Sequence, residues 1–214
     1  MGCTHGAGAN SGAQGHLSLH QPSRCQRRVG TLAGRGCHSG DESMSEPRYT
    51  RPALWEDVLD LARKLNRHGA RYVLVGGYAL AAHGLVRMTT DIDIAVAADT
   101  DNNRRWVAAL AELPDGVAAE LAGEADPFAG DMLHAIRIND EFTVDIMPSV
   151  AGVPFATLAQ HAQQLVIDGE AIPVLDLQGL LDTKQHSERP KDQADAVLLR
   201  EALARLALPP TSGS

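Results

Sequence analysis

The stretch "VGGYALAAHGLVRMTTDIDIAV", residues 75–96, decides the fold that we expect for this chain. Gly76 and Gly77 end one apolar run and predict a tight turn into a short helix. Asp91 and Asp93 lie in a second apolar run that predicts a strand, where alternate side chains point to the same face. Two carboxylates about 7 Å apart on one face repel each other, so this pattern requires a compensating positive group.

A hard divalent cation such as Mg²⁺ would supply that positive charge, because it takes carboxylate oxygens as ligands. A glycine turn between a strand and a helix can in turn expose backbone N–H groups to a phosphate. Each feature also has a plain structural explanation. The aspartates could lie on the solvated face of an edge strand. The glycines could be needed only for a backbone conformation that other residues rarely adopt.

The rest of the chain predicts a single domain of α/β (α+β) class, in which helices flank one mixed sheet. The predicted strands are 71–75, 91–96, 133–138 and 142–146, with a further hairpin in "QQLVIDG" and "AIPVL". The predicted helices run from Leu54 to Gly69, through 106–113, near 155–162 and over about 176–206, with a break at "RPKD", 189–192. We therefore expect a domain over 48–208 with a helical C-terminal region.

The composition of residues 1–47 predicts a disordered N-terminal tail. We expect residues 209–214 to form a second disordered tail. The first segment has no aromatic residue before Tyr49 and holds nine of the twenty glycines, so it offers little apolar surface to bury. Met44 opens "MSEPRYTRPALWEDVL", directly ahead of the first helix signal. We expect Met44 to be an alternative start of translation, with the upstream residues then untranslated.

The chain carries a formal charge of −8, and the part after residue 50 carries about −10. Broad coating of nucleic acid needs many exposed Lys and Arg side chains, so the charge argues against this class of protein and leaves room only for a local basic site. No apolar run approaches the roughly 20 residues that cross a bilayer, and the start of the chain lacks the apolar block of a secretion signal. These features predict a cytoplasmic protein with no membrane partner.

Three pieces of the chain, "LVGGYAL", "RMTTDIDIAV" and "FTVDIM", together resemble the minimal nucleotidyltransferases of the polymerase-beta superfamily. Gly77 and Asp91 lie 14 positions apart, which suits the pattern of that superfamily. The late segment "TKQHSERPKDQAD" makes the chain similar to the AbiEii-type and related bacterial nucleotidyltransferases. Several members of that group are toxins of toxin–antitoxin pairs, so the resemblance also implies a cognate antitoxin as a partner.

The resemblance implies a role for each matching residue. Gly76 and Gly77 would hold the triphosphate of a bound NTP, and Asp91 and Asp93 would chelate two Mg²⁺ ions, with Mn²⁺ as a substitute. Asp145 in "FTVDIM" would be the third metal ligand and would help to deprotonate the attacking hydroxyl.

The resemblance extends to residues around this centre. Lys184 and Asp192 match the lysine and aspartate of the AbiEii-like active site, and Lys184 would contact the phosphates as a point charge. Tyr78, Arg87 and Thr90 flank the two motifs and are further candidates for nucleotide binding. Two alternatives remain open: Asp192 as a charge that suits a helix N-terminus, and Arg87 as an ion-pair partner of the acidic strand.

The sequence thus predicts an enzyme that transfers a nucleoside monophosphate from an NTP to a hydroxyl, with Mg²⁺ as cofactor. A tRNA or other RNA 3′ end, a protein hydroxyl and a small molecule are all candidate acceptors. The alternative is a non-catalytic nucleotide-binding or antitoxin-like partner protein with the same fold.

Overall fold

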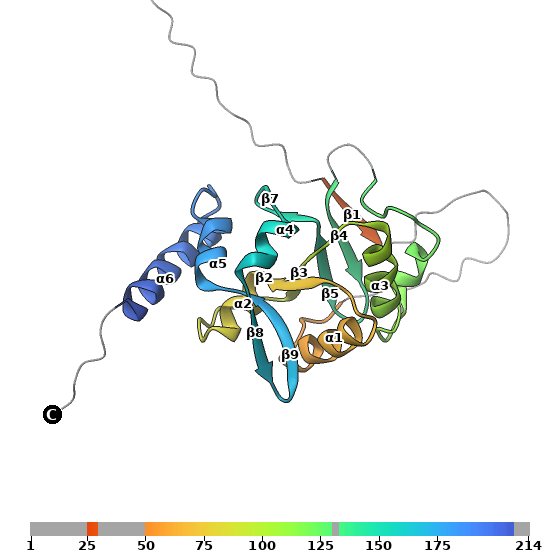
Figure 1. The fold of residues 1–214 in the computed structure, drawn as a ribbon, viewed down its shortest axis with the longest axis horizontal. Helices are drawn as coiled ribbons and strands as arrows, with labels where there is room; N and C mark the ends of the chain where they lie inside the picture. The colour runs from red at the N-terminus through yellow and green to blue at the C-terminus, as the bar shows by residue number, and fades with distance from the viewer. Residues whose placement is uncertain (1–24, 30–49, 130–132, 208–214) are drawn as a thin grey trace, which may run out of the picture.

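The computed structural model describes residues 25–29, 50–129 and 133–207, and Figure 1 shows their arrangement. The strands are β1 (Cys25–Val29), β2 (Tyr72–Val75), β3 (Asp91–Val96), β4 (Leu133–Asn139), β5 (Thr143–Met147), β6 (Ser149–Val150), β7 (Val153–Pro154), β8 (Ala162–Ile167) and β9 (Glu170–Leu175). The helices are α1 (Trp55–Arg67), α2 (Gly76–Ala82), α3 (Thr100–Leu110), α4 (Phe155–Leu158), α5 (Leu177–Lys184) and α6 (Pro190–Leu206), with 3₁₀ turns η1 (Val117–Leu121) and η2 (Ala159–His161). The predicted α/β class, with a helical C-terminal region, is confirmed.

The described strands form a seven-stranded mixed sheet in the order β1-β4-β5-β3-β2-β9-β8, besides the small β6-β7 pair. The acidic strand β3 is central, parallel to β5 on one side and antiparallel to β2 on the other. Ile92 and Ile94 are buried on one of its faces. A carboxylate on the opposite face therefore lies over the middle of the sheet, and the edge-strand alternative for Asp91 and Asp93 is wrong.

Helix α1 packs on its neighbours through an apolar stripe. In α1 the buried residues Val58, Leu61 and Leu65 recur at helical spacing, and this stripe packs against α3 and β9. The turn after β2 leads directly into α2, which packs on β2 and β3. Figure 1 shows α5 and α6 together at one end of the molecule, away from α3. No helix among the described residues combines the length and apolar character that spanning a membrane requires.

The strand β1 falls within the segment 1–47 that we expected to be disordered. Its residues pair in parallel with β4, whose other edge is occupied by β5. An open strand edge can pair with any nearby extended backbone, whatever its composition, so low hydrophobicity did not reveal this strand. Residues 25–29 thus form a strand within this segment. The other residues of 1–47, including Met44, and the tail 209–214 lie outside the described residues.

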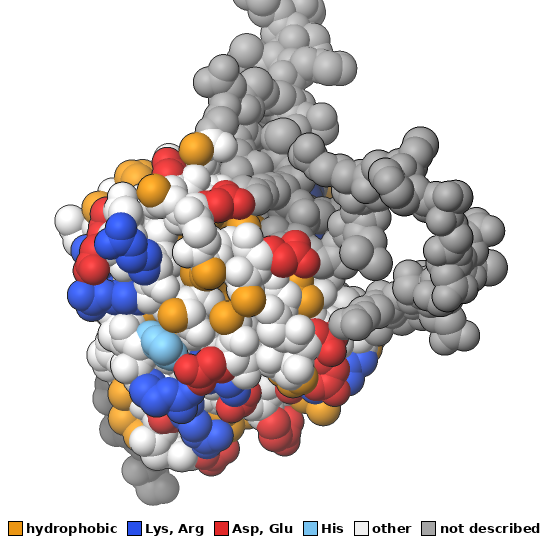
Figure 2. Space-filling view, turned by 90° about the vertical axis from the view of Figure 1, so that its right-hand side faces the viewer, with side chains coloured by type: hydrophobic (Ala, Val, Ile, Leu, Met, Phe, Trp, Pro, Cys, Tyr) orange, Lys and Arg blue, Asp and Glu red, His pale blue; other side chains and the backbone are white. Residues whose placement is uncertain are grey.

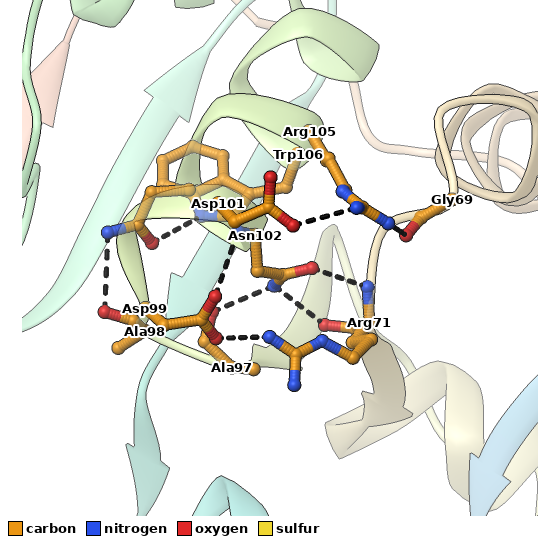
Figure 3. A network of polar contacts seen from close by, with 10 residues as sticks. Gly69, Arg71, Ala97, Ala98, Asp99, Asp101, Asn102, Arg105 and Trp106 are labelled. Atoms are coloured by element: carbon orange, nitrogen blue, oxygen red, sulfur yellow. Dashed lines mark hydrogen bonds and ion pairs between the residues drawn. The ribbon is translucent and has the colours of Figure 1, made fainter.

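Asn102 fixes the start of α3 to the β2–β3 pair (Figure 3). Its side-chain oxygen accepts a hydrogen bond from the Arg71 N–H at 2.6 Å, and its amide donates to the carbonyls of Arg71 (3.0 Å) and Ala97 (2.8 Å). Asp99 caps the same helix by accepting from the Asn102 N–H at 3.1 Å. Asn102 is fully buried, so its side chain replaces water for three backbone groups.

We expect Asn102→Ala to lower the free energy of unfolding by about 2–3 kcal/mol, because three buried backbone groups lose their partner. Urea unfolding followed by circular dichroism measures this change. The matched control is Asp101→Ala in the same helix turn, where an exposed ion pair with Arg105 (2.7 Å) is worth less than about 0.5 kcal/mol. Equal losses in the two variants would contradict the role assigned to Asn102.

The face that carries α3 is a mixed surface. Figure 2 shows acidic and basic side chains interspersed on this face, with small apolar spots between them. On α3, Asp101 and Arg105 form an exposed i,i+4 ion pair. A mixed surface of this kind gives no continuous basic stripe for a phosphate backbone, as the net charge predicts.

Candidate active site

Three acidic side chains lie together on one face of the sheet because of strand register. β3 and β5 run parallel, with Asp93 directly beside Asp145. Asp91 lies two residues before Asp93, so strand alternation places it on the same face. The carboxylates predicted from "DIDI" and from "FTVDIM" therefore come together, although about 50 residues separate them in the chain.

Arg137 of β4 joins this group. It lies directly opposite Asp145 in the antiparallel β4–β5 register. Its Nε donates to Asp145 Oδ1 at 2.8 Å, and its Nη2 donates to Asp145 Oδ2 at 2.7 Å and to Asp91 Oδ2 at 3.1 Å. These hydrogen bonds and the surrounding negative charges raise the pKa of Arg137, which stays protonated. We call Asp91, Asp93, Asp145 and Arg137 the acidic cluster.

Asp93 is the carboxylate of the cluster with the least favourable electrostatic surroundings. Burial, followed by the negative charges of Asp145 and Asp91, raises the pKa of Asp93 to about 6. The positive charges of Lys184 and Lys191 act in the opposite direction but do not offset this effect. Asp93 thus lies where a further cation would lower its pKa and stabilise its ionised form.

The two glycines bring the start of α2 into contact with the acidic strand and its approach. A Cβ atom on Gly76 would lie 2.1 Å from Asp93 Oδ2, and one on Gly77 would lie 2.6 Å from the Thr89 side chain. Gly76 also has a φ of +66°, a conformation that favours glycine. The turn that we predicted as a phosphate cradle therefore lies directly against Asp93, and both positions require glycine for close packing.

Arg137 was not identified from the sequence, which instead offered Arg87 as the ion-pair partner of the acidic strand. That alternative is wrong for the described structure: Arg87 Nε lies 3.2 Å from Asp195 Oδ2 on α6. The strand "LHAIRI" carries one signal, a single arginine between two isoleucines of an apolar strand. Only the register of β4 with β5 shows that this residue faces Asp145.

Lys184 lies in a second, mostly buried group of charges that connects α5 to α6. Its ammonium contacts Asp192 Oδ1 at 2.9 Å and Asp195 Oδ2 at 2.8 Å, and Ser187 donates to Asp192 at 2.7 Å. Burial would raise the pKa of Asp192, but the hydrogen bonds from Lys184 and Ser187 outweigh it and the pKa is lowered. Asp195 was missed in the sequence, although it lies one helical turn after Asp192.

This group, Lys184 with Asp192, Asp195, Ser187 and Arg87, ties three segments together. Arg87 comes from the segment between α2 and β3, so its pairing with Asp195 fixes that segment to α6. Asp192 lies in the first turn of α6, where a negative charge also suits the helix dipole. The structure thus gives Lys184 and Asp192 a structural role, while a direct contact of Lys184 with phosphate stays a prediction.

We expect Lys184→Ala to lower the free energy of unfolding by about 3–5 kcal/mol, since it leaves two carboxylates close together without their shared cation. The Lys184 and Asp195 side chains are only 9% and 3% exposed, so water cannot replace the lost partner. Chemical unfolding monitored by tryptophan fluorescence provides the measurement. Lys191→Ala removes the same charge from an exposed position of α6 and should change stability by less than about 1 kcal/mol. A loss no larger than that of Lys191→Ala would contradict this role.

The remaining predicted site residues have other contacts. Tyr78 is buried, its hydroxyl donates to the Ala53 carbonyl, and its ring lies 5.8 Å from that of Trp55. Thr90 is exposed, and its carbonyl accepts from the Ala53 N–H at 2.9 Å. The side chain of Tyr78 is thus used in packing, whereas that of Thr90 faces solvent beside the acidic strand.

The donor set of the acidic cluster fits a hard divalent cation in charge and chemistry, with three carboxylates on adjacent strands. In the conformation described, no three His, Cys, Asp or Glu side chains among 25–29, 50–129 and 133–207 converge closely enough to hold one. Arg137 already bridges Asp91 and Asp145 in this conformation.

The comparisons with known proteins give similarity in structure alone. No protein-family model matches the chain, and no curated protein matches it. A crystal structure from Thermotoga maritima, provisionally assigned as a nucleotidyltransferase, is 19% identical and covers 72% of this chain and 97% of its own, with a TM-score of 0.46. An antigenic nucleotidyltransferase-like protein from Paracoccidioides brasiliensis is 17% identical over 75% of this chain and 81% of its own, with a TM-score of 0.42.

The solution structure of the antibiotic-resistance factor ANT(2'')-Ia is 14% identical over 72% of this chain and 86% of its own, with a TM-score of 0.39. All three TM-scores are below 0.5, so we transfer no residue role from these proteins. These three structures are described as a nucleotidyltransferase, a nucleotidyltransferase-like protein and an antibiotic-resistance factor.

Proposed function

We propose that this protein is a divalent-metal-dependent nucleotidyltransferase. It would join the α-phosphate of an NTP to a hydroxyl oxygen of an acceptor and release pyrophosphate. The observation that carries this proposal is the placement of Asp91, Asp93 and Asp145 on one face of two adjacent parallel strands, with the Gly76 turn against Asp93.

The residues of the acidic cluster would divide the work by position. Asp91 and Asp93 on β3 and Asp145 on β5 would hold the metal ions, and Asp145 would also accept the proton of the attacking hydroxyl. Bound metal ions would neutralise charge on the transferring group and hold the attacking and leaving oxygens in line. The backbone at Gly76 and Gly77 would orient the triphosphate beside these carboxylates.

The charge of the cluster supports this function over a purely structural one. Three carboxylates face a single guanidinium, so the group keeps a net negative charge on a partly buried surface of the sheet. Such an arrangement opposes folding unless a ligand compensates it. A structural cluster would be expected to balance its charges, as Lys184 and Arg87 do for Asp192 and Asp195.

The test supplies each labelled NTP with Mg²⁺ or Mn²⁺ and three separate acceptor pools: total RNA including tRNA, proteins of a cell lysate, and hydroxylated small molecules such as aminoglycosides. Transfer of label together with pyrophosphate release identifies both the base and the acceptor class. A toxin role would follow only if the acceptor is RNA or protein and a cognate antitoxin suppresses the transfer. Asp93→Asn and excess EDTA are the matched inactive controls.

An alternative outcome distinguishes the second hypothesis. Saturable NTP binding in all conditions, with no pyrophosphate released against any acceptor, would favour a non-catalytic nucleotide-binding partner. Release that persists unchanged in Asp93→Asn would place the activity elsewhere.

A further inference from the structure

The Arg137 guanidinium occupies the space between two carboxylates of the acidic cluster. Its Nη2 lies 2.7 Å from Asp145 Oδ2 and 3.1 Å from Asp91 Oδ2, and so bridges the strands β5 and β3. Its Nε adds a second bond to Asp145 at 2.8 Å. One nitrogen atom is thus shared by two of the three side chains that we propose as metal ligands.

A divalent cation bound by the same two oxygens has to lie in the same space. Mg²⁺ and Mn²⁺ bind carboxylate oxygens at about 2.1 Å, closer than an N–H donor, so cation and guanidinium cannot both bridge Asp91 Oδ2 and Asp145 Oδ2. Two positive groups in this space would also repel each other. Occupation by Arg137 and occupation by a bridging cation therefore exclude each other.

Arg137 has the freedom to leave without a change in the sheet. Its side chain is 27% exposed, compared with 11% for that of Asp145, and four rotatable bonds separate the guanidinium from the β4 backbone. The guanidinium is also a planar donor that suits phosphate oxygens. Once displaced, it would still lie on the face of the sheet where the phosphates of an NTP are proposed to bind.

We propose that Arg137 is a positioning residue that takes the place of the cation in the metal-free protein and is displaced when a divalent cation binds. This inference rests on the proposed function, because it concerns the same acidic cluster. Arg137 holds Asp91 and Asp145 near each other while no cation is bound, and it competes with the cation for them. In the metal-free protein the guanidinium opposes the repulsion between the carboxylates of Asp91 and Asp145. When a cation binds, it takes over this role from Arg137.

The direct test is titration of the full chain with Mn²⁺, followed by the electron paramagnetic resonance signal of the free ion. We expect Arg137→Gln to bind Mn²⁺ about tenfold more tightly than the wild type, since the competing cation is gone. Arg137→Lys keeps the charge but loses the two-pronged contact, and its affinity should fall between the two. Arg51→Gln is the matched control, because Arg51 makes a similar two-pronged pair with Asp57 (2.6 and 2.8 Å) outside the cluster.

Thermal unfolding gives an independent readout. In EDTA, Arg137→Gln should unfold at a lower temperature than the wild type, and saturating Mn²⁺ should raise its unfolding temperature by more than it raises that of the wild type. Arg51→Gln should show the same Mn²⁺ response as the wild type. If Arg137→Gln does not fold in EDTA, the same comparison is made with Arg137→Lys.

The outcomes separate this inference from the proposed function. Unchanged or weaker Mn²⁺ binding in Arg137→Gln and Arg137→Lys, with a wild type that binds, would overturn the competition and leave the function standing. Mn²⁺ binding by neither the wild type nor any variant would overturn the metal site itself. If Arg51→Gln and Arg137→Gln both bind Mn²⁺ more tightly than the wild type, the loss of one positive charge from the protein explains the effect. That result would overturn the specific role of Arg137.

Discussion

Asp93→Asn is expected to lower nucleotidyl transfer by on the order of 10³-fold, because it removes a preorganised charged group from the proposed active site. The same substitution is expected to make the metal-free protein more stable at pH 7.5. The second effect has an electrostatic origin. Burial, with the charges of Asp145 and Asp91, raises the pKa of Asp93 to about 6, so its ionised form opposes folding. Asparagine keeps the shape and removes the charge.

The pH dependence gives this prediction a definite sign. The pKa of Asp93 is about 6 in the folded protein and close to the ordinary 3.8 when unfolded, so the folded state binds the proton more tightly. Stability contributed by this group is therefore full below pH 4 and is lost as the pH rises from about 4 to 6. The advantage of Asp93→Asn over the wild type should be on the order of 3 kcal/mol well above pH 6 and become small near pH 4.

Urea unfolding in EDTA at pH 4.0, 5.0, 6.0 and 7.5 measures this difference, and pyrophosphate release measures the activity. Asp101→Asn on the exposed start of α3 is the control for the loss of one carboxylate, with no expected change in activity. A stability difference between Asp93→Asn and wild type that stays constant across this range would contradict the electrostatic account.

Gly76→Ala should impair both folding and activity. The added Cβ would lie 2.1 Å from Asp93 Oδ2 and 2.7 Å from its Cγ, so either the turn or the carboxylate has to move. The φ of +66° adds backbone strain for any residue with a Cβ. We expect a loss of about 2–4 kcal/mol in stability from strain and overpacking together. Residual activity should fall by about 100-fold or more, because a shift of about 1 Å in a reacting group has that cost.

Gly84→Ala separates the two contributions. Gly84 has a φ of +79°, but a Cβ atom added to it would have no neighbour within 4 Å, so alanine there meets backbone strain alone. It should cost about 1–2 kcal/mol and leave nucleotidyl transfer unchanged. The excess loss in Gly76→Ala then measures the contact with Asp93. If the two variants lose the same stability and Gly76→Ala stays active, the close packing of the turn on Asp93 has no functional consequence.

The local parts of the site could be predicted from the sequence because they depend on spacing within one element. Alternation in "DIDI" places Asp91 and Asp93 on one face whatever strands pair with β3. The glycine pair marked the turn into α2, and "RPKD" marked the start of α6 at Pro190. These inferences required no knowledge of the neighbours of each element.

The partners of these residues could not be predicted in the same way. Arg87 was adjacent in sequence to the acidic strand, yet it pairs with Asp195, more than 100 residues later. β1 pairs with the edge of β4, although nothing in the composition of β1 predicts a strand. Ion pairs of this kind depend on which strands and helices become neighbours, and any of several charged residues would satisfy the same local pattern.

The sequence by itself thus determined the main strands and helices around the site, though not β1, and that two carboxylates share one face of β3. The tertiary structure decided that Asp145 joins them and that Arg137 bridges Asp91 and Asp145. The physical reason is that side-chain direction within an element follows from backbone geometry over a few residues. Register between strands follows from the packing of the whole sheet, and a shift of one residue would turn Arg137 to the opposite face.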